Sequence, residues 1–197
     1  MIYSKIPTKE IELMHNLEEK SFNLIDTNIK FKRKNGGVFD YKRNESFICS
    51  FANKDSMSDI SKISGECFSS SRFHLDPFIS DSTANKIKME WTNNYFKGLR
   101  GSDMIISYNS KERRVVGFLQ LLEINEDLVV DLIGVDPSFH GRGIASDMIS
   151  FCLEQIPHDN FFVGTQIVNI PSIKLYSKFN FQFHSAEYVF HYHNICK

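Results

Sequence analysis

Residues 128–145 read LVVDLIGVDPSFHGRGIA. The residues up to Val135 are almost continuously apolar, which is typical of a central strand buried on both faces. Pro137 ends this strand, and Gly141 and Gly143 allow the backbone to turn and to approach a ligand closely. Apolar residues at helical spacing then predict a helix from about Gly141 to Gln155. The stretch therefore predicts a strand, a glycine-containing loop and a helix in succession.

The loop between this strand and this helix has the features of an anion-binding site. Free N–H groups at the start of the helix point into the loop, and the helix dipole adds partial positive charge there. Such a helix start binds phosphate or pyrophosphate, and Arg142 would add charge at the rim. The glycines by themselves fit an ordinary strand–helix turn equally well. The loop also lacks the Gly-Lys-Ser/Thr of a Walker loop and the full Gly-x-Gly-x-x-Gly of a dinucleotide fingerprint.

The pattern of apolar residues along the rest of the chain predicts a mixed α/β sheet. Residues 104–107, 115–122 and 128–135 are strand-like runs joined by short polar turns, which indicates an antiparallel meander. Further strands are expected at residues 22–32, 47–49, 161–167 and 181–192, and further helices at residues 9–17, 56–68, 81–99 and 171–179.

Composition excludes several classes of protein. The chain is 42% hydrophobic and 24% charged, close to globular averages, so a disordered or collagen-like chain is excluded. Its net charge of −1 argues against a nucleic-acid partner. No apolar run approaches the ~20 residues that span a bilayer. The N-terminus lacks an apolar signal core, so we expect a cytoplasmic protein without membrane contact.

The cysteines and histidines predict neither a disulfide nor a metal site. The four cysteines show no Cys-x-x-Cys spacing and are expected to be reduced thiols. His191 and His193 would share one face of a strand, but the sequence shows no third ligand at a recognisable spacing, so no metal is expected. The aromatic strand that ends the chain leaves open a homodimer that pairs through it.

A second run, at residues 169–181, reads NIPSIKLYSKFNF. Its pattern Asn-x-x-Ser-x-x-Leu-Tyr-x-Lys-x-x-Phe, together with His-Gly-Arg-Gly-Ile-Ala at 140–145, resembles the Gcn5-related N-acetyltransferase (GNAT) superfamily. The resemblance extends from about residue 47 to the C-terminus. His140 departs from the Gln or Arg that usually opens the family's loop, although much of the phosphate contact there comes from backbone N–H groups. Asn180 replaces the usual Gly, and Asn tolerates the left-handed conformation that a helix end needs.

The resemblance implies a mixed, mostly antiparallel sheet flanked by helices at residues 47–197, with residues 1–46 as a small N-terminal α/β accessory lobe. It implies acyl-coenzyme A as co-substrate and no metal. The cofactor-binding residues would be Ile133, Gly134, Val135, His140, Gly141, Arg142, Gly143, Ile144, Ala145, Asn169 and Tyr176. Of these, Asn169 would contact the cofactor arm or merely cap a helix. Tyr176 would also protonate the leaving thiolate, whereas spacing alone makes it a packed aromatic.

A narrower resemblance points to acyltransferases that act on nucleotide-linked amino sugars, such as TDP-fucosamine acetyltransferase. It rests on Ser71-Arg72-Phe73-His74, on the acidic helix that follows with Trp91 and Asn94, and on Thr165-Gln166. The resemblance implies that the acceptor contacts Ser71, Arg72, Phe73, Trp91 and Gln166. Arg72 would clamp the acceptor's diphosphate through paired hydrogen bonds. A surface salt bridge for Arg72 and a core position for Trp91 are the alternatives.

The base that takes the amine proton is left open between Asp131, Glu123 and His74. Each could instead be exposed or ion-paired, and an inward carboxylate on the meander is costly unless it is used. The first functional hypothesis is N-acylation of an amino deoxysugar on a nucleoside diphosphate, expected to be dTDP, for surface polysaccharide such as lipopolysaccharide or O-antigen. The alternatives are a GNAT enzyme for another amine (peptide, polyamine or drug) and a non-catalytic acyl-CoA sensor, which needs no general acid.

Overall fold

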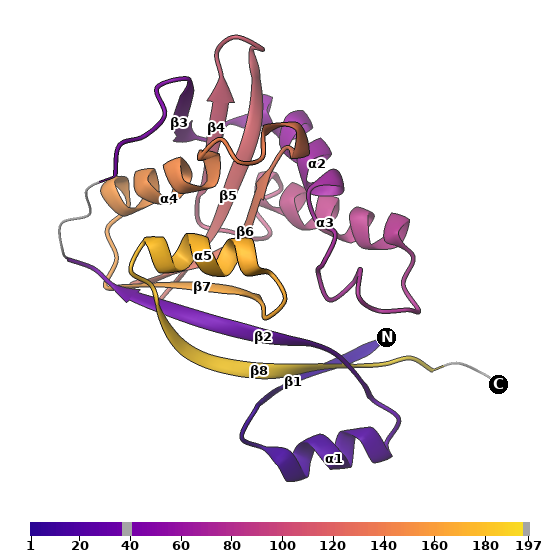
Figure 1. The fold of residues 1–197 in the computed structure, drawn as a ribbon. Helices are drawn as coiled ribbons and strands as arrows, with labels where there is room; N and C mark the ends of the chain where they lie inside the picture. Colours follow the sequence, from indigo (N-terminus) through magenta and orange to yellow (C-terminus); the bar gives the residue numbers. More distant parts are fainter. Residues whose placement is uncertain (37–40, 195–197) are drawn as a thin grey trace. The chain divides into compact units, whose positions relative to one another are not determined.

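The computed structural model describes residues 1–36 and 41–194, and Figure 1 shows the fold. In these ranges the strands are β1 (Ile2–Pro7), β2 (Asn23–Lys34), β3 (Phe47–Phe51), β4 (Met104–Asn109), β5 (Arg114–Ile124), β6 (Asp127–Val135), β7 (Asn160–Gln166) and β8 (Gln182–Tyr192). The helices are α1 (Ile11–Glu19), α2 (Met57–Glu66), α3 (Asp81–Phe96), α4 (Ile144–Gln155) and α5 (Ile170–Lys178), besides short 3-10 turns at Lys54–Ser56 and Pro137–Phe139. Each strand and helix predicted from the sequence is present, and β1 is an addition to them.

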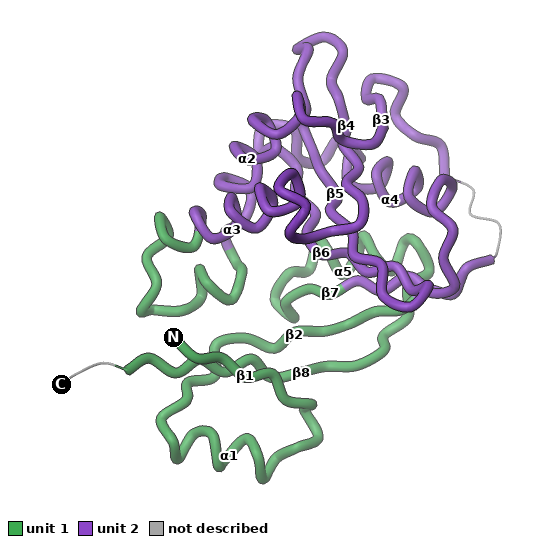
Figure 2. Tube along the Cα trace, turned by 180° about the vertical axis from the view of Figure 1, so that it is seen from behind, with its two compact units in different colours: residues 1–32, 70–84, 164–197 green, residues 33–69, 85–163 purple. Residues whose placement is uncertain are grey.

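The chain forms two compact units, which Figure 2 colours separately. Unit 1 contains residues 1–32, 70–84 and 164–197, and unit 2 contains residues 33–69 and 85–163. The N-terminal residues thus share a unit with the C-terminal part of the chain. The accessory lobe expected at residues 1–46 stays a prediction, and its boundary does not coincide with a boundary between the units.

Unit 1 is built on three antiparallel strands. β8 lies between β1 and β2, where Tyr3 of β1 and Asn23 of β2 both pair with His191. Residues 187–191 of β8 therefore have hydrogen-bonded neighbours on both sides and no free edge. Along that stretch β8 has no edge through which a second copy could pair, because β1 already occupies it, and the homodimer itself stays a prediction.

Unit 2 contains the meander. Its strand order is β3–β4–β5–β6–β7. The first four strands are antiparallel neighbours, which confirms the predicted meander, and β7 runs parallel to β6, where Leu128 pairs with Phe161. The prediction of an α/β fold with a mixed, mostly antiparallel sheet flanked by helices is confirmed (Figure 1).

Two helices cover opposite faces of β5 in unit 2. Phe118 joins Ile60 of α2 in the hydrophobic core, whereas a Cβ placed on Gly117 would lie 2.9 Å from Cγ2 of Ile144 in α4. Neighbouring residues of a strand point to opposite faces, so α2 and α4 pack on different sides. Each large apolar side chain buried there contributes ~1.5–3 kcal/mol. The glycine lets the first turn of α4 approach the sheet closely.

The strand that is buried on both faces is β5, not β6. Residues 115–121 of β5 are all buried, whereas buried and half-buried residues alternate along β6. The prediction from the apolar run 128–135 is wrong on this point. Ile133 and Val135 remain half-buried at the end of β6 that leads into the glycine loop. Although β6 lies between β5 and β7, Ile133 and Val135 at its end are therefore not fully covered.

None of the helices in the described ranges is long and apolar enough to cross a membrane.

Candidate active site

The glycine loop of unit 2 has the geometry of an anion cradle. Gly141 and Gly143 both have left-handed backbone conformations, with φ of 76° and 86°, which cost other residues ~1–2 kcal/mol. Gly143 is the N-cap of α4, and the Asp147 N–H donates to its carbonyl. The N–H groups of the three residues before Asp147 have no acceptor within the helix. The residues present therefore fit a phosphate or pyrophosphate group.

A hollow of about 470 Å³ lies beside this loop. Its volume is within the range of small-molecule sites. The lining residues come from the start of β3, the β4–β5 turn and the glycine loop: Asn44, Ser46, Phe47, Asn109, Lys111, Gly141 and Arg142. The hollow offers two cationic side chains, Lys111 and Arg142, and several polar ones next to the N-terminus of α4.

Two side chains of the loop, those of His140 and Arg142, fold back onto the loop itself. Nε2 of His140 lies 3.0 Å from the Val135 carbonyl oxygen, and because a carbonyl only accepts, Nε2 carries the hydrogen. Arg142 donates from Nη2 to the Ser138 carbonyl at 3.2 Å and lies 4.6 Å from the centroid of the Phe139 ring. These side chains shape the loop, and the backbone N–H groups remain directed at a ligand. Because backbone N–H groups supply the anion contacts, His140 in place of the usual Gln or Arg is compatible with anion binding.

A segment before β3 braces the loop, and the sequence reasoning missed it. Asp147 is fully buried in α4, and its Oδ1 accepts hydrogen bonds from Tyr41 Oη (2.8 Å) and from the Asn44 N–H (3.2 Å). Asn44 Nδ2 also donates to the Arg142 carbonyl at 3.3 Å. Burial, with Asp147 adding to it, raises the pKa of Tyr41 to about 12, so Tyr41 stays a neutral donor. An acidic residue among the core positions of α4 was the available signal.

Asp131, one of the three candidate bases, is ion-paired. Its oxygens accept from Arg100 Nε and Nη2, both at 2.6 Å, from Trp91 Nε1 at 2.9 Å and from Gln120 Nε2 at 3.0 Å. A carboxylate with four donors, two of them on a guanidinium, has little capacity left for a further proton donor. Trp91 belongs to this cluster, with Arg100 4.7 Å from its ring centroid. The contacts favour the ion-paired alternative for Asp131.

Glu123 and His74, the other two candidate bases, differ in their surroundings. Glu123 is exposed near the end of β5, which matches the exposed alternative. His74 is half-buried in unit 1, with Nδ1 2.7 Å from Ser71 Oγ. The role of base stays a prediction for each of them, and the burial favours His74 over Glu123.

Tyr176 in unit 1 is held as a neutral phenol. Asn169 caps α5, where its Oδ1 accepts from the Ser172 N–H at 3.2 Å. Tyr176 follows one turn after Ser172, which hydrogen-bonds its hydroxyl, and the ring is 1% exposed between Phe31 and Phe181. Burial raises the pKa of Tyr176, so the hydroxyl keeps its proton at neutral pH. Asn180, after the helix, takes the expected left-handed conformation with φ 59°.

The predicted acceptor segment of unit 1 presents a stacked guanidinium. Cζ of Arg72 lies 4.0 Å from the ring centroid of Tyr3 and 4.7 Å from that of Phe73. Ser71 and Phe73 are buried on either side of it. Gln166 is half-buried at the end of β7, and its carbonyl accepts from the Asn169 N–H at 3.0 Å. The structure thus places the guanidinium of Arg72 on the rings of Tyr3 and Phe73, whereas Ser71 contacts His74.

A buried cluster of Asp76, His191 and His193 lies in the same unit. Oδ2 of Asp76 is 2.5 Å from His191 Nδ1 and 2.7 Å from His193 Nε2, and Oδ1 accepts from the Phe78 N–H. Two ligands of a tetrahedral zinc ion are ~3.3 Å apart, since each lies ~2.0 Å from the metal. The shorter separations here are those of hydrogen bonds. Asp76 is the third polar partner that the spacing of the two histidines did not reveal.

Comparison with known proteins agrees with this geometry. Residues 62–181 match the acetyltransferase (GNAT) family. The spore coat polysaccharide biosynthesis protein SpsD of Bacillus subtilis is 31% identical over 135 residues, which is 67% of this chain and 46% of that protein. This chain thus spans less than half the length of SpsD.

Solved structures share the fold. A GCN5-related N-acetyltransferase from Sphaerobacter thermophilus aligns with 95% of this chain and 58% of its own, at 10% identity and a TM-score of 0.67. A GCN5-related N-acetyltransferase from Kribbella flavida aligns with 95% of this chain and 66% of its own, at 8% identity and a TM-score of 0.64. With the family match over residues 62–181, the chain belongs to the acetyltransferase (GNAT) family.

Proposed function

We propose that this protein transfers an acyl group from acyl-coenzyme A to the amine of a deoxysugar carried on a nucleoside diphosphate, in the biosynthesis of a surface polysaccharide. The acyl group is expected to be acetyl and the nucleotide dTDP. The sugar assignment has support from the similarity to SpsD, whose name connects that protein with spore coat polysaccharide.

The donor side of the proposal rests on the glycine loop. Backbone N–H groups at the start of α4 would hold the pyrophosphate of the donor. The hollow with Lys111 next to Gly141 gives room for further phosphate or adenosine groups. The half-buried residues Ile133 and Val135 would line the path of the pantetheine arm, where a backbone N–H can stabilise the oxyanion.

Proton transfer is assigned to side chains of unit 1. The amine nitrogen attacks the thioester carbonyl, the C–N bond forms and the C–S bond breaks. Tyr176 gives its proton to the thiolate that forms when the C–S bond breaks; its raised pKa means that the hydroxyl is protonated at neutral pH before the reaction. The amine loses its proton to a base, for which His74 is the half-buried candidate on the acceptor segment. Ser71 would orient that ring through its contact with Nδ1.

The observation that carries the acceptor assignment is the stacked guanidinium of Arg72. Two aromatic rings, those of Tyr3 and Phe73, hold it in place, and a guanidinium binds phosphate oxygens in pairs. An uncharged amine acceptor would have no use for this cation. The proposed acceptor therefore carries a negatively charged group some distance from its amine.

The test is a thiol-release assay with acetyl-CoA and a panel of amines. The panel contains dTDP-linked amino deoxysugars, the same sugars without nucleotide, a polyamine and a peptide N-terminus. The proposal expects the nucleotide-linked sugars to give the highest kcat/KM. Faster acyl transfer to the polyamine or to the peptide would show that the acceptor is another amine. Binding of acetyl-CoA without thiol release on any amine would favour the non-catalytic acyl-CoA sensor.

A further inference from the structure

We infer that Lys5 of β1 acts with Arg72 as an anion-binding pair for the acceptor's diphosphate, so that the N-terminal strand is part of the acceptor site. The inference rests on the proposed function for the identity of the anion. It changes the expected role of the N-terminal residues, which the sequence placed in a lobe outside the acyltransferase core.

Strand register brings the two cations together. Tyr3 and Lys5 are two residues apart on β1, so their side chains leave the same face of the strand. Tyr3 pairs with His191 of β8 and Lys5 pairs with Val189. The guanidinium of Arg72 lies 4.0 Å from the ring centroid of Tyr3, on the face that Lys5 also occupies. Burial and then the charge of Arg72 lower the pKa of Lys5, whereas the charge of Glu187 raises it, so Arg72 is the like charge with the largest effect on Lys5.

Neither cation has a matching anion in the part of the chain that the structure describes. No carboxylate oxygen there lies within 4.0 Å of Lys5 Nζ or of the Arg72 guanidinium. Nη1 of Arg72 is buried and has no hydrogen-bond partner in the described ranges. A buried donor without an acceptor is uncommon in native proteins and calls for a ligand or water. An incoming anion would satisfy this donor and relieve the repulsion.

Two carboxylates of this sheet, Glu187 and Asp26, attract Lys5 but form no ion pair with it. Glu187 accepts a hydrogen bond from Lys30 Nζ at 2.8 Å, so its charge is already matched. Asp26 of β2 pairs with Val189 from the side opposite to Lys5. Two strand spacings therefore separate Asp26 from Lys5, ~10 Å of sheet. Neither Glu187 nor Asp26 therefore forms an ion pair with Lys5 or Arg72 within 4.0 Å.

The segment that carries Arg72 is fixed at a second point. Asp76, four residues later, contacts His191, and His191 is the strand partner of Tyr3. Arg72 stacks on that same Tyr3. The buried Asp76–His191 contact therefore acts as a positioning element that sets Arg72 over the end of β1. A diphosphate, with charge for two cations, matches the pair better than a single carboxylate does.

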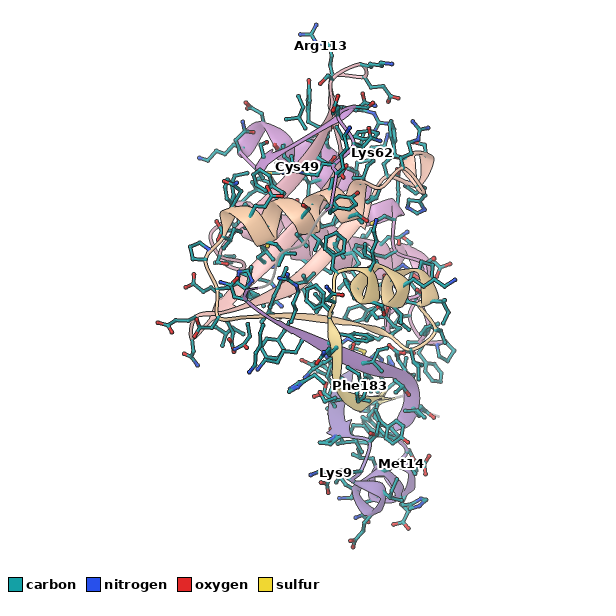
Figure 3. All side chains as sticks on the ribbon, turned by 60° about the vertical axis from the view of Figure 1, so that its left-hand side comes forward. Lys9, Met14, Cys49, Lys62, Arg113 and Phe183 are labelled. Atoms are coloured by element: carbon teal, nitrogen blue, oxygen red, sulfur yellow. The ribbon has the colours of Figure 1, made fainter. Side chains whose placement is uncertain are left out.

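The experiment measures dTDP binding by calorimetry with any affinity tag at the C-terminus, so that β1 is unaltered. Saturating coenzyme A is present throughout, because coenzyme A carries its own pyrophosphate. Lys5→Gln and Arg72→Gln are each expected to weaken dTDP binding about tenfold, the loss of one charge-assisted hydrogen bond. In separate titrations with coenzyme A, the affinity of both variants for coenzyme A should equal that of the wild type. Lys9→Gln is the matched control, since Lys9 is an exposed lysine of the same unit, next to α1 (Figure 3).

Equal dTDP affinity in Lys5→Gln and Lys9→Gln would overturn the inference. If glucuronate competed with dTDP as effectively as inorganic pyrophosphate does, the pair would be a carboxylate site, and the assignment to a diphosphate would be overturned. Inorganic pyrophosphate separates this inference from the proposed function. Suppose that pyrophosphate binding depends on Lys5 but no nucleotide-linked sugar is acylated. The proposed function would then be contradicted, and the anion-binding pair of Lys5 and Arg72 would still be supported. Normal acyl transfer in Lys5→Gln, with an unchanged KM for the sugar nucleotide, would support the proposed function and contradict the anion-binding pair.

Discussion

Nδ1 of His191 lies 2.5 Å from Oδ2 of Asp76, and both side chains are buried. The contact joins the end of β8 to the acceptor segment within unit 1. Burial, together with the charges of Arg72 and His193, lowers the pKa of His191, although Asp76 acts to raise it. Burial by itself would raise the pKa of Asp76, and the hydrogen bonds from His191, His193 and the Phe78 N–H lower it instead. The pair is therefore a neutral imidazole beside a carboxylate at neutral pH.

This pair predicts a pH-dependent stability. The unfolded value for His is about 6.5, and the native value is lower, so the unfolded chain binds more protons between the two values. The stabilisation from neutral His191 is therefore complete above about pH 6.5 and declines as the pH falls. Asp76, whose pKa is also lowered, adds a loss at lower pH. In chemical denaturation, the difference in unfolding free energy between wild type and His191→Gln should shrink on acidification.

The matched control is His184→Gln, which changes an exposed histidine of the same strand. Its difference from wild type should be small and independent of pH. If the curves for wild type and His191→Gln run parallel from neutral pH to pH 5, the buried neutral imidazole is not what the pair provides.

Gly143→Ala is expected to weaken coenzyme A binding about tenfold and to lower the unfolding free energy by ~1–2 kcal/mol. The left-handed N-cap of α4 would be strained, and the new Cβ would lie 3.4 Å from Tyr41 Oη. Gly98→Ala carries the same kind of strain, with φ 68° and nothing within 4 Å of the added Cβ. It should lose stability but keep its affinity in a calorimetric titration. Unchanged affinity in Gly143→Ala would remove the loop from the donor site.

Tyr176→Phe is expected to lower kcat about 100-fold, the effect of removing a general acid. KM for acetyl-CoA should stay within about twofold, because the ring still fills its buried position. Steady-state kinetics measure both constants, with Tyr108→Phe on β4 as the control. Full turnover in Tyr176→Phe would mean that the thiolate takes its proton from another donor.

Asp131→Asn separates an ion pair from a base. The salt bridge to Arg100 predicts a loss of ~1–3 kcal/mol in stability. The pH dependence of kcat/KM should keep its shape, because a carboxylate that already accepts from four donors is not available to take the amine proton. Loss of the acidic limb of that profile would restore Asp131 as the catalytic base.

Local patterns predicted much of the fold. Apolar alternation located the meander, and the glycines with Pro137 located the loop before α4. β1 was not predicted, because the short run Ile2–Pro7 shows no clear pattern of apolar and polar residues. It is stabilised by pairing with β8, a partner at the other end of the sequence. Such nonlocal pairing leaves no trace in a window of neighbouring residues.

The candidate site shows the same limit. The sequence located the loop and Tyr176 because each lies in one continuous motif. It could not bring Tyr41 to Asp147, or Asp76 to His191, because those pairs are more than a hundred residues apart. It also made Asp131 a candidate base, since its partner Arg100 lies on a loop with no pattern that points to it.

The most direct measurement is thiol release from acetyl-CoA with a dTDP-linked amino deoxysugar, compared with the same sugar lacking the nucleotide. The account predicts at least about 100-fold higher kcat/KM for the nucleotide-linked sugar, because diphosphate binding at a remote cation lowers the barrier at the amine. It also predicts that Arg72→Gln removes most of this preference and leaves the free sugar unaffected. Equal rates for the two sugars, with wild type and Arg72→Gln alike, would contradict it.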